Sequence, residues 1–174
     1  MIGRRRLLAG ALGLAAPSLI AGGASAAAPR RLSLLNLHTG EKLTATYFEA
    51  GRYLPDALAA IDRVLRDHRT GAVHPMSPDL LDLVATLSDR LTGAGTVQVI
   101  SGYRSPGSNA ALHARSSGVA TRSLHMLGMA MDIRLPGVEL GRVRQAAMSL
   151  GCGGVGYYPQ SDFVHVDIGR VRQW

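Results

Sequence analysis

Cysteine and lysine are almost absent from this sequence, which holds one of each, Cys152 and Lys42, among 174 residues. A lone cysteine excludes an intramolecular disulfide, and such a thiol is more often a small buried hydrophobic residue than a nucleophile. The residue three positions before the lysine is Thr39, so the Ser-x-x-Lys motif of penicillin-binding serine enzymes is missing. His-Glu-x-x-His is also missing, which excludes a thermolysin-type zinc site. A hydrolase that uses Cys152 with a nearby histidine stays an alternative.

Hydrophobic runs long enough to cross a bilayer are lacking too. The apolar stretch from Leu7 to Ala21 follows Arg4-Arg5-Arg6 and precedes Ala24-Ser25-Ala26, small residues of the kind that a signal peptidase requires. Glycine and proline interrupt this stretch, which is shorter than the roughly 20 residues of a transmembrane helix. We therefore expect residues 1–26 to be an export signal peptide that leaves no stable membrane anchor after cleavage. The order Arg-Arg-x-Leu-Leu resembles a twin-arginine leader, and an ordinary Sec leader is the alternative. Either leader places the mature protein in the periplasm or beyond.

Charge of one sign is only slightly in excess. The formal net charge is +7, from 19 basic and 12 acidic residues. Three of the arginines belong to the predicted leader, so residues 27–174 carry 16 basic and 12 acidic residues, a net charge of +4. This excess suits an anionic polymer such as the cell wall but is too small to indicate nucleic-acid binding. The full sequence has 47% apolar and 18% charged residues, a globular composition, and residues 27–174 are predicted to form a single domain.

The first half of the mature chain has the pattern of a hairpin followed by two supporting helices. Alternating apolar residues over 32–38 and 43–48, on either side of a Thr-Gly pair, predict a β-hairpin. Apolar residues at helical spacing predict an amphipathic helix from Pro55 to Arg69. A second helix is predicted from Pro78 to Gly93, with Ser77 as its N-cap.

The second half is predicted to alternate short strands with helices. Strands are expected over 97–100 and 128–133 and as a hairpin of 155–158 with 163–168, and helices near 109–115 and over 140–150. The turn-rich segment after the first of these strands projects Arg104 from a strand end. Such positions often carry binding sites.

Three side chains in this second half form a candidate metal site. The run Ser123-x-His125-x-x-Gly-x-Ala-x-Asp132 places a histidine before one predicted strand and an aspartate at its end, and His165 lies within another strand. Two nitrogens and one oxygen suit a catalytic zinc ion, which takes three protein ligands and lowers the pKa of a bound water toward about 7. On spacing alone, each histidine could equally be a hydrogen-bonded core residue.

This run resembles the motif of the superfamily that contains the D-Ala-D-Ala metallopeptidases, the murein endopeptidases and the hedgehog signalling domain. Further motifs, in order, are similar to those of its exported YcbK-like branch: His38-Thr-Gly-Glu41, Arg66-Asp-His-Arg69, Ser101-Gly-Tyr-Arg-Ser-Pro106, Gly118-Val-Ala120, Gly153-Gly-Val-Gly-Tyr-Tyr-Pro159 and Phe163-Val-His-Val-Asp167. The resemblance extends from about Leu32 to Trp174. It implies a zinc ion, peptidoglycan stem peptides as substrate, and an α+β fold in which helices flank a small antiparallel sheet that carries the site.

The same resemblance assigns roles to individual residues. It places His125, Asp132 and His165 at the positions of the zinc ligands. Arg104 takes the position of an arginine that faces the substrate, where it would polarise the scissile carbonyl and stabilise the oxyanion. Without the resemblance, Arg104 could equally be a surface residue that fixes a turn.

The general base has two candidates. Related dipeptidases have a glutamate three residues before the last histidine, and this sequence has Asp162 at that position. Asp167 shares a strand face with His165 and is the competing candidate, either as the base or as the partner that orients a ligand. Each aspartate could also be structural, Asp162 as a turn residue and Asp167 as a strand-end hydrogen-bond acceptor.

These features together predict a zinc-dependent peptidoglycan hydrolase, either a murein endopeptidase or a carboxypeptidase, that cuts stem-peptide or crosslink bonds in the cell wall. The alternative from another class is a non-catalytic, zinc-containing module that binds the cell wall. That alternative stays open because a shared fold does not by itself establish catalysis.

Overall fold

The protein is described by a computed structural model that covers residues 28–174 except residue 117, so the predicted leader lies outside the described residues. The strands are β1 (Arg30–Asn36), β2 (Lys42–Glu49), β3 (Arg52–Tyr53), β4 (Val97–Ser101), β5 (Ala130–Arg134), β6 (Gly154–Tyr158), β7 (Phe163–Asp167) and β8 (Arg172–Gln173). The helices are α1 (Pro55–Val64), α2 (Pro78–Thr92), α3 (Pro106–His113) and α4 (Leu140–Leu150), with the short 3-10 helices η1 (Leu124–Leu127) and η2 (Pro159–Ser161). Among the described residues, no helix has the length and apolar character needed to span a membrane.

The described strands form one 8-stranded mixed sheet in the order β3-β2-β1-β4-β5-β7-β6-β8. Most neighbours are antiparallel, but β1 pairs with β4 and β6 pairs with β8 in parallel. The predicted α+β class is confirmed, whereas the prediction of a small antiparallel sheet is wrong. The N-terminal hairpin of β1 and β2 belongs to the same sheet as the later strands, because β1 pairs in parallel with β4, with Leu34 beside Val97.

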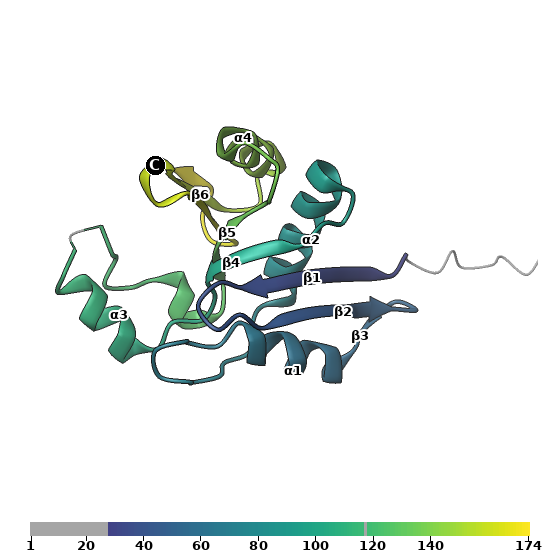
Figure 1. The fold of residues 1–174 in the computed structure, drawn as a ribbon, viewed down its shortest axis with the longest axis horizontal. Coiled ribbons are helices and arrows are strands. Elements are labelled where there is room, and N and C mark those ends of the chain that lie inside the picture. The colour runs from purple at the N-terminus through teal and green to yellow at the C-terminus, as the bar shows by residue number, and fades with distance from the viewer. Residues whose placement is uncertain (1–27, 117) are drawn as a thin grey trace, which may run out of the picture.

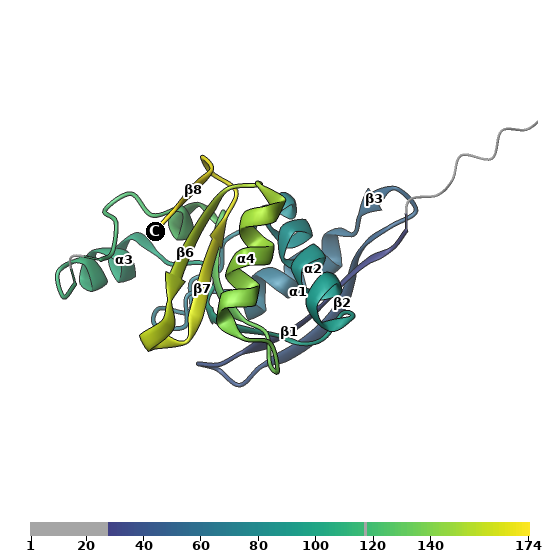
Figure 2. The ribbon, with the colours of Figure 1, turned by 90° about the horizontal axis from the view of Figure 1, so that it is seen from above.

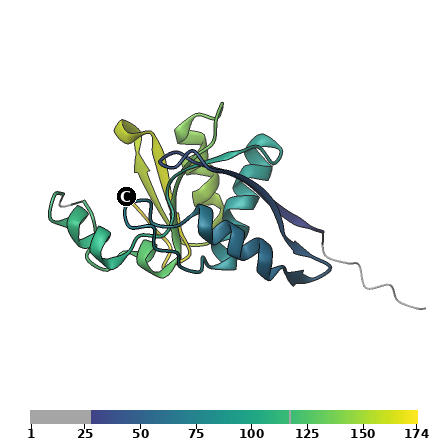
Figure 3. The ribbon, with the colours of Figure 1, turned by 60° about the horizontal axis from the view of Figure 1, so that its bottom comes forward.

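Three helices form a layer against this sheet, and the fourth lies apart from it. α1 packs on β2, α2 on β1 and on α4, and α4 on β6 and β7. Figure 2 shows α4, α2 and α1 next to one another. α3 lies away from this layer, at the end of the molecule where the C-terminus also lies (Figures 1 and 3).

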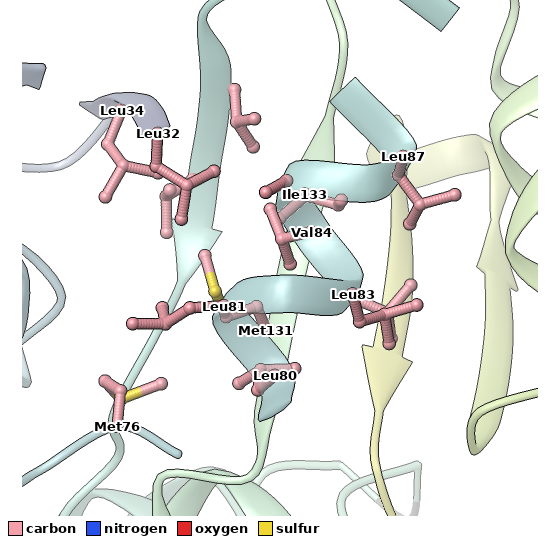
Figure 4. Packing of buried hydrophobic residues seen from close by; sticks show 14 of the residues in the cluster. Leu32, Leu34, Met76, Leu80, Leu81, Leu83, Val84, Leu87, Met131 and Ile133 are labelled. Carbon is pink, nitrogen blue, oxygen red and sulfur yellow. The ribbon is translucent and has the colours of Figure 1, made fainter. Parts of the chain in front are cut away.

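The core lies between α2 and the middle of the sheet, and it determines to which face of the sheet the side chains of β5 point. Figure 4 shows Leu81 and Val84 of α2 against Met131 and Ile133 of β5, all of them fully buried. Each such side chain contributes about 1.5–3 kcal/mol through burial. Because strand residues alternate between the two faces of a sheet, the residue between the two β5 core positions, Asp132, points to the opposite face.

Local signals predict the bounds of α2 and α4 but not the end of α1. α2 and α4 have the predicted bounds to within a residue, although Ser77 makes no side-chain capping hydrogen bond. α1 ends at Val64, five residues before the predicted Arg69. The reason is tertiary, because the carbonyl of Leu65 accepts a hydrogen bond from the backbone N–H of Tyr103 (2.8 Å) in place of a helical partner.

One carboxylate on α2 ties the helix layer to the N-terminal strands. Asp82 accepts hydrogen bonds from the hydroxyl groups of Tyr47 (2.8 Å) and Tyr53 (2.7 Å) and pairs with Arg30 at the start of β1. Tyr47 is fully buried. Burial and the hydrogen bond to Asp82 both raise the pKa of Tyr47, so its hydroxyl is a neutral donor throughout the physiological range.

Replacing this carboxylate should therefore weaken the fold. In Asp82→Ala the hydroxyl of Tyr47 stays buried without its acceptor, so we expect the free energy of unfolding to fall by about 1–3 kcal/mol in urea denaturation. Asp89→Ala removes an exposed aspartate from the same helix and should change this free energy by less than about 0.5 kcal/mol. Equal effects of the two substitutions would show that the cluster adds no stability.

Candidate metal centre

Asp132 and His165 face each other across two neighbouring strands. In the antiparallel register of β5 and β7, Asp132 lies directly opposite His165. Their chain neighbours, including Met131 and Val164, are buried in the core under the helices, so the two polar side chains share the other face of the sheet. The Oδ1 atom of Asp132 lies 2.8 Å from Nδ1 of His165.

His125 reaches the same point from the short helix η1. The hydroxyl of Ser123 accepts a hydrogen bond from the backbone N–H of His125 (3.3 Å), and Gly128 ends η1 in the left-handed region, with φ +65°. A Cβ atom on Gly128 would lie 2.2 Å from a backbone carbonyl oxygen, so only glycine fits there. The Ser-x-His-x-x-Gly spacing thus forms one turn that directs Nε2 of His125 to within 3.3 Å of Asp132 and 3.2 Å of His165.

The structure therefore brings the three predicted ligands together. One ligand atom from each of His125, Asp132 and His165 lies within 4.8 Å of the other two, and all three residues are buried. A catalytic zinc site takes such a set of three protein ligands.

The outer hydrogen bonds of the two imidazoles show which ring nitrogens face the cluster. Nδ1 of His125 lies 2.7 Å from the carbonyl oxygen of Gly102, which can only accept, so Nδ1 carries the hydrogen and Nε2 presents a lone pair inward. Nε2 of His165 lies 3.2 Å from Oδ2 of Asp167, and donation to that carboxylate leaves the lone pair of Nδ1 inward. With Asp132, three acceptor atoms then meet. Acceptors at such distances repel unless a proton or a cation lies between them, and the two-nitrogen, one-oxygen set suits zinc.

The pKa values of Asp132 and His165 are also consistent with a site for a cation. Burial alone would raise the pKa of Asp132, but the neighbouring His125 and His165 outweigh it and hold this pKa well below its usual range. Burial alone would lower the pKa of His165, but the carboxylates of Asp132 and Asp167 raise it. Both directions show that the carboxylates of Asp132 and Asp167 favour a positive charge beside them.

Asp167 lies behind His165 and has no free oxygen. It is fully buried and accepts hydrogen bonds from the backbone N–H groups of Gly154 (2.9 Å) and Gly169 (2.8 Å) and from the guanidinium of Arg172 (2.8 Å). Burial would raise the pKa of Asp167, but these bonds and the one to His165 lower it. Its position suits the orientation of the imidazole through the ring nitrogen farthest from the cluster.

Asp162, the other candidate base, lies at the surface. It follows η2 in the left-handed region, with φ +52°, and its carboxylate pairs with Arg134 of β5. Neither Asp162 nor Asp167 lines the pocket above the metal cluster, although the chain neighbours of Asp162, Ser161 and Phe163, do.

The cluster lies at the bottom of a pocket of about 520 Å³, and Arg104 forms part of the wall. The Arg104 guanidinium makes only long contacts, with Asp132 (3.5 Å), Asn109 (3.4 Å) and Ser101 (3.4 Å). Its Nε atom is buried without a hydrogen-bond partner among the described residues. Burial lowers the pKa of Arg104, yet a guanidinium stays charged, so Arg104 presents a desolvated cation with free N–H groups beside the cluster.

A third buried carboxylate, for which the sequence indicated no role, holds the segment around Arg104. The carboxylate of Asp67 is almost fully buried and accepts hydrogen bonds from the backbone N–H groups of Ser105 (2.9 Å) and Arg69 (2.9 Å). The Ser105 hydroxyl in turn caps α3, which begins at Pro106, three residues earlier than predicted. The only signal in the sequence was the place of Asp67 in the Arg-Asp-His-Arg motif.

The sequence did not predict the positions of Trp174 and Cys152. Trp174 lines the pocket, a position that no motif predicted. Cys152 is exposed, so the prediction of a buried small residue is wrong. Cys152 directly follows Gly151, which ends α4 in the left-handed region. Cys152 also does not line the pocket, so its position gives no support to a cysteine hydrolase.

A buried cluster of two histidines and an aspartate below a pocket with a desolvated arginine is the arrangement of a metal-dependent hydrolase. Comparison with known proteins agrees with this class. Residues 24–174 match the family model described as peptidoglycan L,D-endopeptidase MepK, and the chain belongs to this peptidase family. The resemblance to the exported YcbK-like branch is thereby confirmed.

Curated members of the family are similar to this chain over most of its length. The peptidoglycan L,D-endopeptidase MepK of Escherichia coli strain K12 is 43% identical over 175 residues, which cover 98% of this chain and 96% of the relative. The protein of the same name from Shigella flexneri gives the same values. The probable peptidoglycan L,D-endopeptidase MepK of Haemophilus influenzae is 43% identical over 147 residues, which cover 84% of this chain and 79% of the relative. No solved structure gave a significant match.

The buried carboxylate behind Arg104 should make stability depend on pH. Burial would raise the pKa of Asp67, but hydrogen bonds from Ser105 and Ser108 outweigh it and lower this pKa. Its ionised form therefore stabilises the fold at every pH above the unfolded-state pKa of about 3.9, and this contribution is lost as the pH falls below that value. We expect Asp67→Asn to lower the free energy of unfolding by about 1–3 kcal/mol at pH 7.

The measurement is urea denaturation of both proteins at pH 7 and pH 3. The difference between wild type and Asp67→Asn should shrink at the lower pH. Asp89→Asn removes an exposed carboxylate and should leave the pH dependence of stability close to that of the wild type. A difference for Asp67→Asn that stays constant between the two pH values would contradict the role given to its charge.

Proposed function

We propose that the protein is an exported, zinc-dependent endopeptidase that cleaves L,D peptide bonds in the crosslinks of peptidoglycan. The L,D specificity follows the names of its relatives. The observation that carries the proposal is the convergence of Nε2 of His125, Nδ1 of His165 and the carboxylate of Asp132 below the pocket, with Arg104 beside them.

His125, Asp132 and His165 would hold the zinc ion. When bound, zinc acts as a Lewis acid and lowers the pKa of a coordinated water toward about 7. The guanidinium of Arg104 would donate hydrogen bonds to the carbonyl oxygen of the scissile bond, where negative charge develops. Its desolvated position strengthens that interaction, because few water molecules compete with it.

The two aspartates take different roles in this proposal. Asp167 orients His165, because every bond it makes fixes its carboxylate behind the ring. Asp162 is the candidate base. Its carboxylate is exposed, and its two neighbours in the chain, Ser161 and Phe163, line the pocket. To act as the base, its carboxylate would have to leave its ion pair with Arg134 and accept a hydrogen bond from a water molecule in the pocket.

The setting of this activity is also part of the proposal. Residues 1–26 would direct export by the twin-arginine route, with cleavage after the small residues at their end. The mature domain, residues 27–174, would act in the periplasm, where its net charge of +4 suits the anionic cell wall. The twin-arginine route exports folded proteins, so zinc could be bound before export.

Zinc content and cleavage test the proposal together. The purified mature chain should contain about one zinc ion and release peptides from isolated sacculi, whereas His125→Ala should lose both properties, because two ligands hold zinc much more weakly than three. Metal analysis and mass spectrometry of the muropeptides measure the two effects. His38→Ala removes an exposed histidine outside the pocket and serves as the matched control.

Identical muropeptide profiles for wild type and His125→Ala would refute the enzymatic role. Zinc that is bound without any release of peptides would instead favour the non-catalytic wall-binding module.

Two isosteric substitutions separate the roles of the aspartates. Asp162→Asn should abolish cleavage and leave the zinc content unchanged, because it removes only the proton acceptor. Asp167→Asn should weaken zinc binding about 10- to 100-fold, because it disturbs the orientation of a ligand. Competition with a chelating dye measures zinc affinity, and muropeptide release measures turnover. Full turnover in both variants would argue against either aspartate as the base.

A further inference from the structure

The side chain of Trp174 is a large apolar surface next to the metal cluster. The indole is 47% exposed and lines the pocket, and its ring centroid lies 5.3 Å from that of His165. An exposed apolar ring in a pocket has no role in the core and is typical of a contact surface for a ligand.

Several contacts fix this ring in place. The indole N–H donates a hydrogen bond to the hydroxyl oxygen of Tyr158 (2.7 Å), and the guanidinium of Arg172 lies 4.8 Å from the ring centroid. The backbone of Trp174 donates to Val155 (3.2 Å) and accepts from Tyr157 (3.0 Å). The ring is therefore pre-organised, so binding against it would cost little conformational entropy.

The sequence of β6 leaves room for the indole. Gly156 lies opposite His165 in the register of β6 and β7, and a Cβ atom on Gly156 would lie 2.7 Å from Cε2 of Trp174. Any larger residue at this position would displace the ring. The glycine thus allows the indole to lie against the strand next to a metal-ligand candidate.

The pocket is lined by both aromatic and cationic side chains. Tyr158 and Phe163 stack on each other, with centroids 4.5 Å apart, and together with Trp174 they supply an aromatic surface. Arg104 and Arg122 supply guanidinium groups to the same pocket, and Arg122 makes no ion pair within the described part of the chain. The pocket therefore suits a ligand that has both methyl or methylene groups and carboxylates.

We propose that Trp174 is a substrate-binding residue whose indole packs against the apolar groups of a peptidoglycan stem peptide beside the bond to be cleaved. This role rests on the proposed function, and it adds that the pocket recognises the apolar groups of the substrate. Stem peptides carry alanine methyl groups and free carboxylates, which match the aromatic and cationic residues of the pocket.

Intrinsic fluorescence tests the role directly, because Trp174 is the only tryptophan of the chain. The wild-type protein, treated with a chelator to prevent turnover, is titrated with soluble disaccharide peptides released from sacculi by a muramidase. We expect a shift of the emission and weaker quenching by acrylamide, since the bound peptide would cover the ring. Peptide-free glycan strands should change neither property.

Kinetics on the zinc-loaded enzyme give an independent measure. Trp174→Ala should raise KM for the same peptides roughly tenfold while kcat changes less than about twofold, because the ring binds substrate without entering the chemistry. Tyr158→Phe keeps both rings but removes the hydrogen-bond acceptor of the indole, and it should raise KM about fivefold. Val171→Ala, at an exposed residue of the same terminal segment outside the pocket, is the matched control and should leave both constants unchanged.

Unchanged emission with peptide, together with a wild-type KM for Trp174→Ala, would overturn this role and leave the proposed function intact. An equal response to peptide-free glycan would also overturn it. If peptides shift the emission but no peptide bond is cut by the zinc-loaded protein, the binding role of Trp174 stands and the proposed function fails.

Discussion

The cross-strand pair of Asp132 and His165 is the constraint on which the rest of the centre depends. The two residues meet because β5 and β7 pair in one register, and a shift of one strand by one residue would turn one of them toward the helix layer and separate the pair. The apolar residues that alternate with them, such as Met131 and Val164, prevent that shift, because they are fully buried on the opposite face. The hydrophobic core therefore fixes the polar site by the strict alternation of the strands, and any change that loosens this packing would also loosen the metal centre.

A chain of hydrogen bonds extends outward from this pair and sets the chemistry of the cluster. The carbonyl of Gly102 and the carboxylate of Asp167 take the outer hydrogens of the two imidazoles, so the inner nitrogens present lone pairs to Asp132. Arg172 and backbone N–H groups in turn hold Asp167. A buried group of acceptors without a donor is unfavourable unless a positive charge joins it. The same network that positions the residues thus makes the binding of a cation favourable.

The segments that surround this centre are held by contacts between residues far apart in the chain. Asp67 fixes the turn that carries Arg104, and the Leu65 carbonyl that ends α1 binds Tyr103. The terminal segment brings Trp174 against Gly156. The pocket is lined by residues of the second half of the chain, and contacts with the first half hold the segment that carries Arg104. Its combination of cationic and aromatic groups suits an amphipathic peptide better than a uniform polymer.

The family resemblance, and not the spacing alone, predicted the three residues that meet in the cluster. The sequence by itself determined the α+β class and the bounds of α2 and α4, because caps and periodicity act over a few neighbouring residues. It did not determine the 8-stranded sheet, the end of α1, the outward position of Cys152, or the surroundings of Asp162 and Asp167. Only the tertiary structure decided these, and it also placed Trp174 in the pocket. The physical reason is that each depends on which distant strand or loop supplies a partner, and a local pattern of residues carries no information about that pairing.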